Sequence, residues 1–90
     1  MLSYFRKLEK YVPIVARVHG SSHPEFYEVQ KLYNIINRRI KEVGIENAEL
    51  NEEFYKLREL TNNYKVPDDV CESYESVYKM IAKIDEGYNT

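Results

Sequence analysis

Two histidines offer the first chemistry in this sequence. His19 and His23 are four residues apart, a spacing that places two metal ligands on one face of a helix. Residues 20–22 (Gly-Ser-Ser) and the proline after His23 break that face, because a residue before proline avoids helical geometry. We therefore interpret the pair as a helix-ending histidine and a turn histidine, with metal binding by His19 and His23 as the alternative.

The single cysteine, Cys71, is a possible nucleophile or redox group. It falls in the first turns of an expected helix, where the helix dipole favours a thiolate, but also one step off the apolar stripe, where free cysteine is commonly buried. No histidine is near it in sequence to act as a base. Structural packing is therefore the favoured interpretation, and redox or nucleophilic use the alternative.

The other polar residues form no recognisable catalytic set. The nine tyrosines fit the packing of a small core better than a partner surface, and the acidic residues, Glu53 and Asp85 among them, fit solvated helix faces. The sequence has no Glu-x-x-His motif, phosphate-binding glycine loop or Ser-His-Asp constellation. We therefore expect no enzymatic activity and identify no small-molecule substrate.

Charge and hydropathy argue against two further classes of partner. The net charge is −2, from 13 basic and 15 acidic residues, which gives no general field for nucleic acid or acidic lipid. No apolar run reaches the roughly 18–20 residues of a membrane span, and the first residues do not resemble a signal peptide. One cysteine cannot form an internal disulfide. We expect a cytoplasmic protein without nucleic-acid or membrane partners.

The chain length and the turn residues indicate one domain of four helices. Ninety residues, 43% of them hydrophobic, suffice for a single domain (residues 1–90) with a thin core. Turn residues at 20–24, 44 and 65–69 separate four segments, in which apolar residues recur at spacings of three and four. The expected stripes are Phe5, Leu8, Val12, Val15 and His19; Phe26, Val29, Tyr33, Ile36, Ile40 and Val43; Leu50, Phe54, Leu57, Thr61 and Tyr64; and Val70, Tyr74, Val77, Ile81 and Ile84.

These stripes predict helices over about residues 2–18, 24–43, 47–63 and 67–86. Pro13 is expected to kink or restart the first helix, Ser22 and Glu25 to form a capping box, and Asn47 to cap the third helix. Since no segment alternates with period two, we expect no sheet. Short turns favour neighbouring helices of opposite direction, so the predicted fold is an all-α, antiparallel up-down-up-down four-helix bundle.

Two stretches resemble the helix junctions of a known family. Residues 18–26 (Val-His-Gly-Ser-Ser-His-Pro-Glu-Phe) and residues 57–71 (Leu-Arg-Glu-Leu-Thr-Asn-Asn-Tyr-Lys-Val-Pro-Asp-Asp-Val-Cys) are similar to the first and last junctions of the di-iron proteins that repair iron–sulfur clusters. The resemblance implies a hemerythrin-like four-helix bundle, which in that family carries two iron atoms.

The family's iron ligands have no counterparts at the matching positions. Val43 and Asn47 occupy the places of the histidine and glutamate of the family's second helix, and Asn47 also falls at the third-helix histidine. We expect the ligands of the first and fourth helices, and the family's cysteine-rich N-terminal segment, to lie outside this chain. All these ligands belong to one end of the bundle, whereas His19 is expected at the other, about 30 Å away.

We therefore expect a non-catalytic, metal-free bundle that acts through protein contacts or self-association. Its shortened end exposes apolar residues such as Leu2, Val43 and Ile45, which favours a homodimer or a protein partner. The alternative is an iron protein related to iron–sulfur cluster repair and nitrosative or oxidative stress, with iron held between chains by His19, His23 and acidic side chains. A redox sensor based on Cys71 is the third hypothesis.

Overall fold

Four helices account for the secondary structure of residues 2–88, the part of the chain that the computed structural model describes. They are α1 (Leu2–His19), α2 (Glu25–Val43), α3 (Asn51–Thr61) and α4 (Glu72–Tyr88), and no strand occurs in these residues. The radius of gyration is 12.2 Å, and a compact domain of this length is expected to have about 12 Å. The predicted all-α, four-helix class is confirmed.

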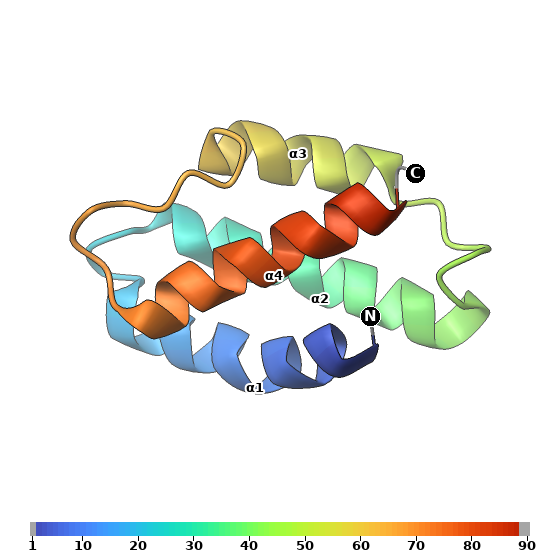
Figure 1. Ribbon diagram of the computed structural model, residues 1–90, viewed down its shortest axis with the longest axis horizontal. Helices are drawn as coiled ribbons and strands as arrows, with labels where there is room; N and C mark the ends of the chain where they lie inside the picture. The colour runs from blue at the N-terminus through green and yellow to red at the C-terminus, as the bar shows by residue number, and fades with distance from the viewer. Residues whose placement is uncertain (1, 89–90) are drawn as a thin grey trace.

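The helices lie roughly along the long axis of the molecule (Figure 1). α1 packs against α2 and α4, and α2 also packs against α3. The α1–α2 and α3–α4 connections meet at one end, which we call the junction end (residues 19–25 and 62–72). The α2–α3 connection lies at the other end with the start of α1 and the end of α4, and we call this the terminal end (residues 2–5, 44–50 and 85–88).

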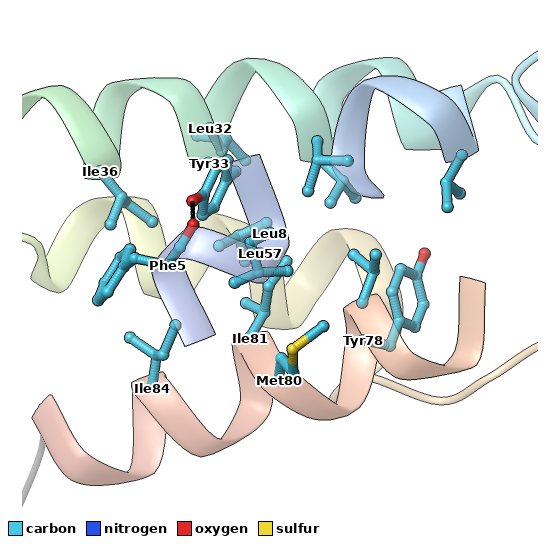
Figure 2. Packing of buried hydrophobic residues seen from close by; sticks show 14 of the residues in the cluster. Phe5, Leu8, Leu32, Tyr33, Ile36, Leu57, Tyr78, Met80, Ile81 and Ile84 are labelled. Carbon is cyan, nitrogen blue, oxygen red and sulfur yellow. Dashed lines mark hydrogen bonds between the residues drawn. The ribbon is translucent and has the colours of Figure 1, made fainter. Parts of the chain in front are cut away.

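One hydrophobic core receives side chains from all four helices (Figure 2). Most of the expected stripe positions are buried, whereas His19, Ile40, Tyr64 and Val70 are half-buried and Val43 is exposed. Tyrosines form part of this core, and Figure 2 shows the hydrogen bond that the Tyr33 hydroxyl donates to the Phe5 carbonyl, at 3.2 Å. Bulky rings with paired hydroxyls thus pack a small core, as the composition indicated.

The start of α3 differs from the prediction. Asn47 does not cap this helix, since its side-chain amide donates to the Val43 carbonyl at the end of α2 and α3 begins only at Asn51. The Tyr88 hydroxyl instead accepts the Leu50 N–H at 2.9 Å. A residue from the far end of the chain therefore satisfies the backbone N–H of Leu50, the residue that directly precedes α3.

The other predicted helix ends hold only in part. Glu25 bonds to His23 and α2 has no side-chain cap, so the expected capping box is absent. α4 begins at Glu72 rather than near residue 67, and α1 runs through Pro13 as a single helix. At the end of α2, Gly44 adopts φ 81° and ψ 156°, a backbone region essentially restricted to glycine.

A left-handed turn follows α3. Asn62, Asn63 and Tyr64 have φ values of 53°, 60° and 63°, which is unusual for three consecutive residues other than glycine. The Tyr64 N–H donates to Thr61 Oγ1 at 2.8 Å, and the Tyr64 hydroxyl donates to Asp85 on α4 at 2.7 Å. The two hydrogen bonds hold a strained backbone segment against the core.

Within residues 2–88, none of the helices combines the length and apolarity that a membrane crossing needs.

Candidate functional site

The side chains that the sequence analysis singled out for reactivity or metal binding lie together at the junction end, although the histidines and Cys71 are far apart in the sequence. His19 is the last residue of α1, and His23 lies in the following connection. Cys71 directly precedes α4, and its carbonyl accepts the Glu75 N–H at 3.2 Å, as the residue before a first helical turn does. Tyr74, in the first turn of α4, is fully buried beneath them.

The closest pair in this group joins the two halves of the chain. His19 Nε2 lies 3.0 Å from Cys71 Sγ, although the two residues are 52 positions apart. Cys71 is exposed, contrary to the packing that we expected for it, and His19 is half-buried. The sequence placed no histidine beside Cys71, but the fold supplies one, and a thiol within hydrogen-bonding reach of an imidazole is the arrangement of an activated cysteine.

His23 is held by carboxylates on both of its ring nitrogens. Nδ1 lies 3.1 Å from Glu25 Oε1, and Nε2 lies 3.1 Å from Asp69 Oδ1. The His23 side chain is only 14% exposed, so it links the start of α2 to the connection before α4 from a largely buried position. These contacts tie the two junctions together.

The buried Tyr74 ring packs against both histidine rings. Its ring centroid lies 5.5 Å from that of His19, nearly perpendicular at 89°, and 5.6 Å from that of His23. The Tyr74 hydroxyl pairs with that of Tyr78 at 3.0 Å. Burial, followed by this hydrogen bond, raises the pKa of Tyr74 above its ordinary value, so the phenol stays neutral.

The structure thus brings His19 and His23 to one end without giving them a common partner. His19 contacts Cys71, whereas His23 contacts Glu25 and Asp69. Among the described residues, no group of three or more His, Cys, Asp and Glu side chains is arranged to hold a metal ion.

The terminal end contains the positions that the resemblance assigns to iron ligands, and the residues there do not fit a di-iron centre. Val43 has no donor atom in its side chain, and the Asn47 amide nitrogen is bound to the Val43 carbonyl at 3.0 Å. The Tyr88 ring packs on Phe54 with centroids 5.2 Å apart, and its hydroxyl donates to the Ala48 carbonyl at 3.0 Å. The Tyr88 ring thus packs between the start of α3 and the connection before it, and an open cavity of about 710 Å³ lies beside them, lined by Val43, Asn47 and Glu53 among others.

Two buried carboxylates are paired with arginines. Glu53 Oε1 accepts from Arg39 Nη1 at 3.0 Å, and Asp85 Oδ2 accepts from Arg58 Nε at 3.0 Å. Both carboxylates were expected on solvated faces, and both are buried. The position of Asp85, four residues after Ile81 on the apolar stripe, was the signal in the sequence for its burial. Burial and the bond to Asp85 also raise the pKa of Tyr64.

The fold and these contacts define a small, compact domain of four helices, with aromatic packing at one end and a solvent-accessible thiol–imidazole pair at the other. Comparison with protein-family models gave no match, and neither did the comparisons with curated proteins and with solved structures.

Proposed function

We propose that this chain is a metal-free, non-catalytic bundle of hemerythrin-like, antiparallel up-down-up-down topology that acts in the cytoplasm through protein contacts or self-association. The kinship with the iron–sulfur cluster repair family rests on the two resembling stretches. Contacts between residues of these stretches, His19 with Cys71 and His23 with Asp69, are consistent with two helix junctions at one end of such a bundle.

The pairing of the buried carboxylates carries this proposal. In the implied family, glutamates at the end that corresponds to the terminal end bind iron, but here Glu53 and Asp85 accept hydrogen bonds from arginines. A carboxylate that already neutralises a guanidinium is a poor ligand, because binding a cation would leave the arginine charge unpaired. The buried carboxylates thus stabilise the fold, and the proposed function depends on the surface of the molecule.

The surface that best suits a second copy of the chain is the outer face of α1. Ile14 and Val18 are one helical turn apart and are 36% and 60% exposed, and Tyr27, at the start of α2, is 52% exposed. At the terminal end, Val43 is 50% exposed and Ile45 half-buried, while the Leu2 side chain lies outside the described residues. Exposed apolar side chains on one helix face favour association.

Sedimentation velocity over a range of concentrations tests self-association and locates it. We expect a dimer that Val18→Glu weakens by about tenfold or more, because a charge would be buried in the contact. Val43→Glu is the matched control, with similar exposure at the other end, and should change the dimer little. A monomer at every concentration would refute the proposed self-association. A dimer that only Val43→Glu dissociates would show that the contact lies at the terminal end instead.

The iron-binding alternative is favoured by one observation, the meeting of two imidazoles at the junction end. His19 and His23 both contact Tyr74, and a second chain would have to supply further ligands. Under this alternative, iron copurifies in about stoichiometric amount and is lost in the His19→Ala, His23→Ala double variant. Protein that carries no iron after growth in iron-rich medium would exclude it.

A further inference from the structure

We propose that Cys71 and His19 form a reactive thiol–imidazole pair, a modification site that exchanges with small, non-anionic disulfides to form a mixed disulfide. This inference is independent of the contacts proposed for the α1 face. It rests on the distance between the two side chains, on the accessibility of the sulfur and on the charges around it.

The geometry meets the requirements of a base-assisted thiol. His19 Nε2 lies 3.0 Å from Cys71 Sγ, so the imidazole can take the thiol proton directly. The perpendicular contact with the buried Tyr74 ring fixes the plane of the imidazole. Cys71 itself is exposed, which leaves the sulfur open to a reagent from solvent.

The position of Cys71 in the fold also favours negative charge on the sulfur. The residue stands at the start of the 17-residue helix α4, with its carbonyl bonded to the Glu75 N–H. The N-terminus of a helix carries a partial positive charge, which stabilises an anion in its first turn. A thiolate formed by proton transfer to His19 is therefore stabilised by the imidazolium and by the helix N-terminus, and it is opposed by the acidic side chains nearby.

The surrounding charges select the class of disulfide. Residues 66–78 include four acidic residues and neither lysine nor arginine. Among the four, Asp69 and Glu72 lie within two positions of Cys71 and are exposed. On the α1 side, Arg17 is the nearest basic residue to His19 in sequence. Because acidic side chains predominate, a cationic or neutral disulfide approaches more readily than an anionic one.

The reaction balances without any further reagent. His19 Nε2 takes the proton from the Cys71 thiol, and the thiolate attacks one sulfur of the disulfide. The S–S bond breaks, its electron pair leaves with the second sulfur, and this thiolate takes the proton from the His19 imidazolium. Cys71 is thereby oxidised to a mixed disulfide, while the other half of the reagent is reduced to a free thiol.

The test is the rate at which cystamine, a cationic disulfide, adds to the full chain at neutral pH, followed by intact mass. We expect His19→Gln to slow the reaction by about tenfold or more, because glutamine is no base. His23→Gln is the matched control, since it removes an imidazole that contacts Glu25 and Asp69 rather than Cys71, and the glutamine amide can still donate a hydrogen bond to a carboxylate. This variant should react within about twofold of the wild-type rate. Cys71→Ser should gain no mass.

Two outcomes would overturn the proposal. One is a His19→Gln protein that reacts at the wild-type rate. The other, which remains decisive if that variant does not fold, is a folded wild-type chain that reacts more slowly than the same chain unfolded in urea. The charge selection is tested with oxidised glutathione, which is anionic and should react more slowly than cystamine by a margin that shrinks in about 0.5 M NaCl. Equal rates at low salt would contradict the assigned class of disulfide.

Discussion

Replacement of Asp85 is the sharpest test of the hydrogen bonds that link α4 to α3 and to the turn after it. Its buried carboxylate accepts hydrogen bonds from Arg58 at 3.0 Å and from the Tyr64 hydroxyl at 2.7 Å. A hydrogen bond to a charged group contributes about 1.5–3 kcal/mol, and we take about 2 kcal/mol for Tyr64. The Arg58 side chain is 38% exposed and stays hydrated, so we count about 1 kcal/mol for it. Asp85→Ala should therefore lower the free energy of unfolding by about 3 kcal/mol.

Such a loss is large for this chain, because a domain of 90 residues has a total stability of about 5–14 kcal/mol. The assay is urea unfolding followed by far-ultraviolet circular dichroism, and the melting temperature should fall by about 12–24 °C. Asp68→Ala, at an exposed position in the connection before α4, is the control and should cost less than about 0.5 kcal/mol. A loss below about 1 kcal/mol for Asp85→Ala would refute the assignment of these bonds.

Two further changes probe the core and the first junction. Burial raises the pKa of the buried and half-buried tyrosines above the ordinary value of 10.0, so the folded chain holds these protons more tightly than the unfolded one; the affected residues are Tyr33, Tyr64, Tyr74 and Tyr78. The contribution of these raised pKa values to stability is complete below about pH 10 and falls as the pH rises further. The urea concentration at the unfolding midpoint should therefore be lower at about pH 11 than at about pH 8. An unchanged midpoint would contradict this. Gly20→Ala should cost about 1–3 kcal/mol in thermal unfolding, because the added Cβ would lie 2.3 Å from the Tyr27 ring and 2.4 Å from the Ala16 carbonyl oxygen. A neutral Gly20→Ala variant would show that the α1–α2 junction packs more loosely than described.

The sequence predicted the helices well because their apolar stripes are set by local periodicity. Phe5, Leu8, Val12 and Val15 are buried as the three- and four-residue spacing required. Helix starts were less predictable because tertiary contacts decide them. Tyr88 lies 38 residues beyond Leu50, and its hydroxyl accepts the N–H of Leu50, the residue that directly precedes α3.

The candidate site was predictable only in outline. The resemblance associated His19 and Cys71 with two junctions at one end of a bundle, but no local pattern indicates a contact between residues 52 positions apart. The burial of Asp85 was in principle detectable from its place on the α4 stripe, four residues after Ile81. Its pairing with Arg58 depends on how α3 and α4 face each other, which no spacing within one helix determines.

Native mass spectrometry of the full chain, purified from cells grown in iron-rich medium, tests the central claim most directly, because a single spectrum reports both bound metal and the number of chains. The account predicts a species with the mass of two bare chains. About one or two iron atoms per chain would contradict the metal-free bundle, and a bare monomer at every concentration would contradict its self-association.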